Sequence, residues 1–211
     1  MVQGVDAVIT FVIPYRAHPD RAGRLERLTA LLATQLHAGM EIIVSDQSGA
    51  FNEAVCDLVT TYILEPRGSY NPARARNLAI GMARNEWVCS LDVDVIPPAD
   101  FCEQLEASLP AGLMTYCTFE VLEGDRPHFD PPTYWGSAAF LYSQALWCVA
   151  GGYCEDYEGY GYEDPDFCDR CMSAGAAHTP LPITVQHDPH PQVEGINQDI
   201  ERNRAIYERR H

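Results

Sequence analysis

Short apolar runs rich in β-branched residues alternate with amphipathic segments along the first half of the chain. The expected strands are residues 7–13, 41–45, 62–64 and 87–91, and the expected helical segments are residues 20–37, 52–60 and 72–84. A strand, a helix and a strand joined by short links predict right-handed βαβ units, so the carboxyl ends of these strands should meet at one edge of a parallel sheet. Ligands of such sheets bind outside that edge.

The second half of the chain continues the alternation less regularly. The expected helices are residues 99–109, 144–149 and 163–174, and the expected strands are residues 113–119, 138–142 and 181–186. Residues 120–133 form a polar, proline-rich loop, and a loop of this length inside a domain is usually functional or mobile. Residues 197–210 indicate a polar helix or tail. With 211 residues, 46% of them hydrophobic, we expect one α/β domain spanning residues 1–211.

The charge of the chain restricts its ligands. A formal net charge of -16 and a pI near 4.6 disfavour binding to nucleic acid and to anionic membranes. An anionic ligand must therefore be held by a local positive site. All 14 basic residues are arginine, and the planar guanidinium group grips phosphate through paired hydrogen bonds.

The cysteines and the amino-terminal residues indicate a cellular compartment. The eight cysteines are scattered, and Cys168 and Cys171 have no second pair at zinc-ligand spacing, so we expect buried thiols in a reducing compartment. The apolar run at residues 7–13 has no basic lead-in and is too short to span a bilayer. We therefore expect a soluble, cytoplasmic protein without a membrane span.

Two carboxylates, Asp92 and Asp94, follow the strand expected at residues 87–91. Such a pair can direct one carboxylate at a divalent cation and the other at a sugar hydroxyl or a metal-bound water, as in a nucleoside diphosphate site. Aspartate is also common in solvated turns, so both interpretations stay open. His187 ends the last expected strand and is a candidate third ligand, because imidazole suits manganese, although an ordinary surface histidine is the alternative.

Charged side chains near two helix starts have two interpretations each. Arg74 and Arg76 lie in the first turn of a helix, where the helix dipole disfavours cations, so they either face an anion or are solvated. Glu163 and Asp164 begin another helix within an aromatic, glycine-rich stretch. They are either a simple acidic helix start or carboxylates in a sugar-stacking setting that can accept a proton from a hydroxyl.

Together these pieces resemble a glycosyltransferase of the GT-A fold, from about residue 7 to residue 190. The first half resembles family 2 glycosyltransferases in Ile13-Pro14-Tyr15-Arg16, Val44-Ser45-Asp46, Ala75-Arg76-Asn77-Leu78-Ala79-Ile80 and Leu91-Asp92-Val93-Asp94. The second half resembles the carboxyl-terminal part of galactosyltransferases and bacterial chondroitin-type polymerases in Trp135-Gly136-Ser137-Ala138-Ala139-Phe140, Gly151-Gly152-Tyr153 and Gly159-Tyr160-Gly161-Tyr162-Glu163-Asp164-Pro165-Asp166. The Asp-x-Asp motif is unspecific alone, whereas the Glu-Asp signature at this distance behind it is specific.

The resemblance implies a fold and its division. We expect a Rossmann-like, three-layer α/β sandwich with a mixed, mainly parallel sheet. Residues 1–98 would form the nucleotide-binding half, residues 99–190 the acceptor and catalytic half, and residues 191–211 a carboxyl-terminal tail or helix.

The resemblance also implies roles for individual residues. Nucleotide and donor binding falls to Pro14, Tyr15, Arg16, Asp46, Arg76, Asp92, Trp135 and Gly136, with Asp46 toward the base. Asp94 and His187 would bind Mn²⁺ or Mg²⁺, and His187 is preferred to His190 because it lies closer to the strand end. Asp164 would be the catalytic base, and Glu163 and Tyr160 would bind the acceptor, although the family often has Trp where Tyr160 stands.

The expected activity is metal-dependent transfer, with inversion, of a sugar from a nucleoside diphosphate sugar, expected to be a UDP-sugar. The acceptor would be the hydroxyl of a saccharide, a peptide or a small molecule. One alternative is a nucleotidyltransferase, but residues 14–18 are not the glycine-rich basic loop that this activity usually needs. The other is a non-catalytic nucleotide-sugar-binding module, which would have no use for the base Asp164.

Overall fold

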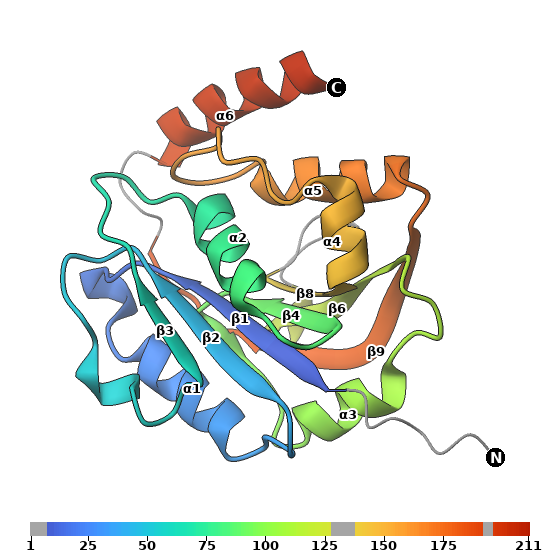
Figure 1. Cartoon of the computed structure of the whole chain (residues 1–211). Helices are drawn as coiled ribbons and strands as arrows, with labels where there is room; N and C mark the ends of the chain where they lie inside the picture. The colour runs from blue at the N-terminus through green and yellow to red at the C-terminus, as the bar shows by residue number, and fades with distance from the viewer. Residues whose placement is uncertain (1–7, 128–137, 192–195) are drawn as a thin grey trace.

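A mixed β-sheet lies between two layers of helices in the computed structural model, which describes residues 8–127, 138–191 and 196–211 (Figure 1). The strands are β1 (Ile9–Tyr15), β2 (Glu41–Asp46), β3 (Thr61–Leu64), β4 (Trp87–Leu91), β5 (Val95–Ile96), β6 (Thr115–Glu123), β7 (Arg126–Pro127), β8 (Ala139–Ser143) and β9 (Ala177–His187). The helices are α1 (Arg24–Ala33), α2 (Pro72–Met82), α3 (Phe101–Ser108), α4 (Gln144–Ala150), α5 (Glu163–Ser173) and α6 (Ile196–Arg210), with 3₁₀ turns at Pro19–Arg21 and Glu53–Val55.

The strand order of the sheet is β3-β2-β1-β4-β8-β6-β9-β5, with β7 paired to β6. Strands β3, β2, β1 and β4 are parallel, which confirms the predicted βαβ units. Tyr15 pairs with Asp46, so β1 and β2 end together at one edge. Strand β8 runs antiparallel to β4 and β6, whereas β6 and β9 are parallel. The predicted mixed α/β sheet is therefore confirmed.

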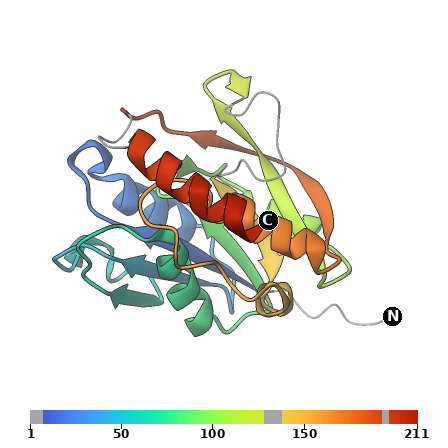
Figure 2. The ribbon, with the colours of Figure 1, turned by 90° about the horizontal axis from the view of Figure 1, so that it is seen from above.

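Each strand of the parallel half alternates its side chains between two apolar cores. Phe11 and Ile13 of β1 pack into the core that contains Leu25 and Leu28 of α1, whereas Val12 packs into the core that contains Ala79 of α2. Helices α1 and α3 therefore cover one face and α2, α4 and α5 the other, giving the predicted three layers. Figure 2 shows α6 crossing the outer side of the second layer.

Several predicted elements have different bounds. Helix α1 is shorter than the predicted residues 20–37, because Gly23 adopts a left-handed φ of 73° that separates the 3₁₀ turn from the helix. Residues 52–60 contain only the turn Glu53–Val55. Strand β6 continues to Glu123, so the predicted loop at 120–133 begins as a strand, and its residues 128–133 lie outside the described part.

Strand β9 is also longer than the predicted residues 181–186. It spans 11 residues and includes Pro180 and Pro182. The register against β6 shifts between Thr118 and Glu120, opposite this proline-containing segment. Such an irregularity accommodates proline inside a strand because a ladder hydrogen bond is already missing there.

The cysteines are all free thiols, as predicted, but not all are buried. Cys89, Cys102, Cys117, Cys168 and Cys171 are buried, whereas Cys148 is exposed and Cys56 and Cys154 are intermediate. Within residues 8–127, 138–191 and 196–211, no helix combines the length and apolar character needed to cross a bilayer.

Glu41 provides a test of this packing, because it begins β2 and lies away from the carboxyl end of that strand. Its buried carboxylate accepts hydrogen bonds from the Thr10 hydroxyl (2.7 Å), the Arg84 backbone N–H (2.7 Å) and the Arg84 Nε (2.8 Å). Burial alone would raise the pKa of Glu41, but the bonds from Arg84 and Thr10 hold it below its ordinary value.

We expect Glu41→Gln to lower the free energy of unfolding at pH 7 by about 1–3 kcal/mol, because it leaves buried donors without an ionised acceptor. Since the folded-state pKa is lowered, the advantage of wild type should persist above the ordinary glutamate pKa and shrink as the pH falls below it. Urea unfolding from pH 3 to pH 8 measures this, with the exposed Glu103→Gln as the matched control. An advantage of wild type that grows toward acid pH would contradict this account.

Candidate active site

A cavity of about 730 Å³ opens at the carboxyl ends of β1, β4 and β9. Its walls come from both halves of the chain, including the residues around Arg16, the turn after β4, the start of α5 and the segment after β9. The predicted site residues that line it are Pro14, Arg16, Arg76, Asp92, Asp94, Tyr160, Glu163, Asp164 and His187. The fold thus brings most of the predicted site together.

Four predicted residues are not placed in this cavity. Tyr15 is buried in the core beneath it. Asp46 is fully buried, and its carboxylate accepts hydrogen bonds from the Ser48 N–H (2.7 Å) and from the Tyr62 hydroxyl. Both residues therefore end their strands with buried side chains that do not line the cavity. Trp135 and Gly136 lie outside the described residues.

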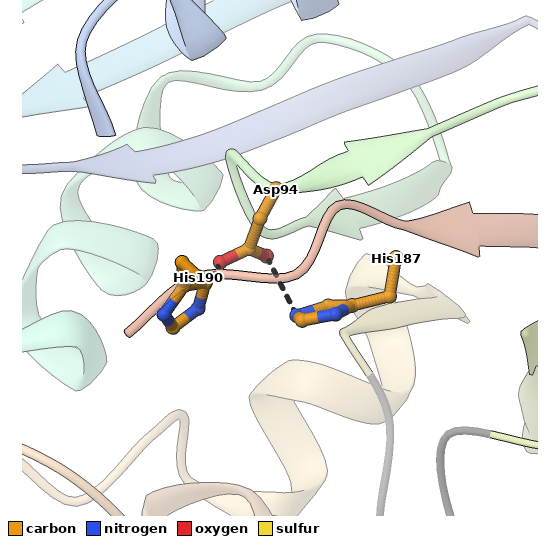
Figure 3. Close-up of side chains that lie close together, drawn as sticks. All are labelled: Asp94, His187 and His190. Atoms are coloured by element: carbon orange, nitrogen blue, oxygen red, sulfur yellow. Dashed lines mark ion pairs between the residues drawn. The ribbon is translucent and has the colours of Figure 1, made fainter. Parts of the chain in front are cut away.

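Asp94, His187 and His190 form a candidate metal-binding group (Figure 3). Their ligand atoms all lie within 4.8 Å of one another. The Nε2 atoms of His190 and His187 lie 3.0 and 3.8 Å from the two different carboxylate oxygens of Asp94. Both histidines considered from the sequence therefore belong to the group, rather than His187 alone.

Neighbouring contacts orient this group. The Nδ1 of His190 lies 2.9 Å from the Pro191 carbonyl, which can only accept, so Nδ1 carries a hydrogen and Nε2 faces Asp94. Arg24 donates hydrogen bonds to the carbonyls of Asp188 and Pro189 at 2.9 and 3.0 Å, which fixes the backbone between the two histidines.

The donor set indicates which cations fit. One carboxylate and two imidazoles suit a divalent transition-metal cation better than Mg²⁺, which prefers an all-oxygen set, and Mn²⁺ can be held by such mixed oxygen and nitrogen ligands. Burial alone would raise the pKa of Asp94, but the hydrogen bond from His190 and the nearby charge of Arg21 hold it below its ordinary value. The carboxylate is therefore ionised and ready to bind a cation at neutral pH.

Besides the metal-binding group, the site contains three carboxylates that surround the buried guanidinium of Arg76. Its NH2 lies 2.8 Å from Asp92 Oδ1, and its NH1 lies 3.2 Å from Glu163 Oε1 and 3.4 Å from Asp164 Oδ1. Of the two interpretations of the α2 arginines, Arg76 thus faces anions, which are the chain's own carboxylates. Arg74 likewise pairs with Glu65 and Glu155 at the surface.

One cation facing three carboxylates leaves excess negative charge. Burial raises the pKa of Asp164 well above its ordinary value, Arg76 opposes the shift, and Glu163 and Asp92 add to it. Burial also raises the pKa of Asp92, to about 6. A carboxylate with a raised pKa is a stronger base than a solvated aspartate, so Asp164 is suited to accept a proton.

Some cavity residues were not predicted from the sequence. Arg21 places its NH2 3.4 Å from His190 Nε2 and its NH1 3.9 Å from Asp94 Oδ2. Its position shortly after β1 was the available signal. Ile196, Asp199 and Arg202 of α6 also line the cavity, although this segment carries no motif and was predicted only as a helix or tail.

Two protein-family models match overlapping parts of the chain. Residues 10–151 match the family model "Glycosyl transferase family 2". Residues 119–202 match the family model "N-terminal domain of galactosyltransferase". No curated protein sequence matches the chain.

Solved structures of low sequence identity share the fold. The catalytic domain of Drosophila beta1,4galactosyltransferase 7, in complex with xylobiose, has a TM-score of 0.61 at 20% identity, covering 93% of this chain and 79% of that one. The mannosyltransferase PcManGT from Pyrobaculum calidifontis, in complex with GDP-Man and Mn²⁺, has a TM-score of 0.68 at 17% identity, covering 95% and 64%. S. aureus TarS 1-349 has a TM-score of 0.63 at 14% identity, covering 94% and 63%. The predicted GT-A fold is confirmed.

The crowding of carboxylates around Arg76 predicts that the site lowers the stability of the fold. Because the folded-state pKa of Asp164 is raised, its contribution opposes folding increasingly as the pH rises above the ordinary aspartate pKa. We expect Asp164→Asn to raise the thermal unfolding midpoint at pH 8 by about 2–4 °C, and to change it less at pH 4. The exposed Asp57→Asn is the control, and a lower midpoint for Asp164→Asn at pH 8 would contradict the expectation.

Proposed function

The chain belongs to glycosyl transferase family 2, and from that premise we propose that it is a manganese-dependent, inverting glycosyltransferase. It would move a sugar from a nucleoside diphosphate sugar to an acceptor hydroxyl. One observation carries the proposal: a single cavity contains both a cation-binding group and, at Asp164, a carboxylate whose pKa is raised. Since both halves of the chain line this cavity, we assign residues 1–211 to one catalytic domain.

We propose a UDP-sugar as the donor. The match of residues 119–202 to a galactosyltransferase family model supports this choice, as does the similar fold of a mutant Drosophila beta1,4galactosyltransferase 7 in complex with manganese, UDP-Gal and xylobiose. A GDP-sugar is the alternative, because the similar PcManGT was in complex with GDP-Man. Pro14, Arg16 and Asp92 would contact the nucleotide, and Arg21 would face the diphosphate.

Asp94, His187 and His190 would hold the manganese ion. When bound, the cation would neutralise the charge that develops on the leaving diphosphate. Arg16 and Arg21 also line this cavity and add fixed positive charge to it. This local charge explains how so acidic a chain would accept an anionic donor.

Asp164 would deprotonate the acceptor hydroxyl as it attacks the anomeric carbon. Arg76 orients Asp164 and Glu163 from behind, at 3.4 and 3.2 Å. Tyr160 would stack against the acceptor, since it lines the cavity and remains 53% exposed. We propose a saccharide acceptor over a peptide or small molecule because of this aromatic surface. The free thiols support activity in a reducing compartment.

Replacing the base should separate transfer from binding. We expect Asp164→Asn to lower the transfer rate by about 10²–10⁴-fold, because proton removal in the transition state is lost. The affinity of Asp164→Asn for UDP in the presence of Mn²⁺ should stay close to that of wild type. The control variant Asp57→Asn should keep both the transfer rate and the UDP affinity of wild type. UDP released from UDP-galactose, with xylobiose as the first acceptor, is the measurement, and survival of transfer would show that another residue is the base.

The products distinguish the alternatives. Release of UDP supports glycosyl transfer, whereas formation of UTP and galactose 1-phosphate from UDP-galactose and pyrophosphate would indicate a nucleotidyltransferase. Binding without turnover would indicate a non-catalytic module. A thermal-shift panel of UDP- and GDP-sugars with and without Mn²⁺ extends the test, and no response to any of them would overturn the proposal.

Replacing the proposed metal ligands should affect nucleotide binding only when the cation is present. We expect Asp94→Ala and His190→Ala each to weaken Mn²⁺-dependent UDP binding by more than about tenfold. Even the loss of a residue that only hydrogen-bonds to a metal ligand typically lowers metal affinity by about that factor. The exposed His37→Ala is the matched control. Isothermal titration with UDP, with and without Mn²⁺, measures the effect, and unchanged affinities would remove these residues from the site.

A further inference from the structure

The segment of residues 158–162, which includes Tyr160, has an unusual backbone conformation. Gly159, Gly161 and Tyr162 have φ values of 71°, 90° and 73°. Among the described residues, Tyr162 is the only non-glycine with positive φ. A side-chain-bearing residue in this region is strained, and such a conformation persists only where surrounding contacts impose it. The source of those contacts is therefore relevant to the site.

Helix α6 supplies these contacts, chiefly through Asn203. This fully buried side chain donates from Nδ2 to the carbonyls of Glu158 (2.9 Å), Tyr160 (3.1 Å) and Gly161 (2.9 Å). An amide NH₂ has two hydrogens, so three carbonyls share them. One turn earlier, Asp199 Oδ2 accepts from the Tyr160 N–H at 3.3 Å.

The contact between α6 and the segment leaves no spare room. A Cβ atom built on Gly159 would lie 2.1 Å from Asp199 Oδ2, so only glycine permits this approach. At the other end of α6, Arg210 Nε donates to the buried Asp166 at 2.9 Å, and Tyr207 donates to Asp169. Helix α6 is thus fixed to α5, the helix that begins with Glu163 and Asp164.

The same segment forms a wall of the cavity. Tyr160 lines it beside Glu163 and Asp164, together with Asp199 of α6. Partial burial raises the pKa of the Tyr160 hydroxyl, and the charges of Glu163, Asp92 and Asp164 add to the shift. The position of Tyr160 relative to the base depends on the backbone that Asn203 binds.

We propose that α6 is part of the acceptor site, and that Asn203 is a positioning residue that fixes Tyr160 against the Glu163–Asp164 pair. This inference rests on the function proposed above. Asn203 does not touch the reacting atoms, and it acts through the carbonyls of residues 158, 160 and 161. Replacing Asn203 should therefore weaken binding of the acceptor and leave binding of the donor unchanged.

The chemistry at this position requires a donor. Aspartate has nearly the same shape as asparagine, but it would place a charged acceptor against three carbonyls. Glutamine keeps the NH₂ group on a side chain one methylene longer, so it should restore part of the effect. Asn197 lies on the same helix but is exposed, which makes Asn197→Asp a matched control.

Two measurements test the proposal on the full chain. In Asn203→Asp, amide hydrogen exchange should accelerate at least about tenfold in peptides covering residues 158–163, since each lost hydrogen bond is worth about that factor. With Mn²⁺ and UDP-galactose, the KM for xylobiose should rise by about the same factor. The KM for UDP-galactose, measured through its hydrolysis to UDP, should stay within about twofold of wild type. Asn203→Gln should recover part of both losses, and Asn197→Asp should match wild type.

If Asn203→Asp does not fold, Asp199→Ala replaces it, because it removes the contact to the Tyr160 N–H from a partly exposed position. Unchanged exchange at residues 158–163 would overturn the proposal. So would a parallel rise in both KM values with a lower unfolding midpoint, which would show a merely structural role. If wild type neither transfers nor hydrolyses the donor, the proposed function fails, and the exchange measurement still decides whether α6 fixes this segment.

Discussion

The arrangement of the carboxylates in the site depends on their ion pairs with the buried guanidinium of Arg76. The guanidinium lies within 3.4 Å of carboxylate oxygens from Asp92 and from the adjacent Glu163 and Asp164, which follow Asp92 by about 70 residues. Without this cation, three carboxylates could not be held ionised so close together in a buried setting. Burial raises the pKa of Asp164, and the charges of Glu163 and Asp92, which Arg76 balances only in part, add to the shift. The raised pKa that makes Asp164 a base also means that ionising Asp164 lowers the stability of the fold.

The sheet explains why these groups meet. Parallel strands β1, β2 and β4 end at one edge, and β9 reaches that edge from the second half of the chain, where His187 pairs with Val95 just after Asp94. Backbone pairing thus brings a histidine and a carboxylate about 90 residues apart into one metal-binding group. Arg24 of α1 then fixes the segment leading to His190. The cation group and the base line one cavity that neither half forms alone.

Local patterns predicted the strands and the edge where they meet, because a buried parallel strand has a strong apolar signature and topology then fixes its direction. They also indicated Asp94, Glu163 and Asp164 as candidate site residues, because these stand in recognisable motifs, and His187, because it ends a strand. They could not show that Tyr15 and Asp46 are covered, since burial at a strand end depends on tertiary neighbours such as Tyr62. Nor could they reveal the role of α6, because Asn203 acts through backbone carbonyls and backbone acceptors leave no trace in a sequence.

Pulsed electron paramagnetic resonance of bound Mn²⁺ tests the central claim most directly, because it identifies the atoms around the ion. The account predicts ¹⁴N couplings from two imidazoles, one of which disappears in His190→Ala, and a ³¹P coupling that appears when UDP is added. A bound Mn²⁺ ion with no imidazole nitrogen coupling, or with no phosphorus coupling in the presence of UDP, would contradict it.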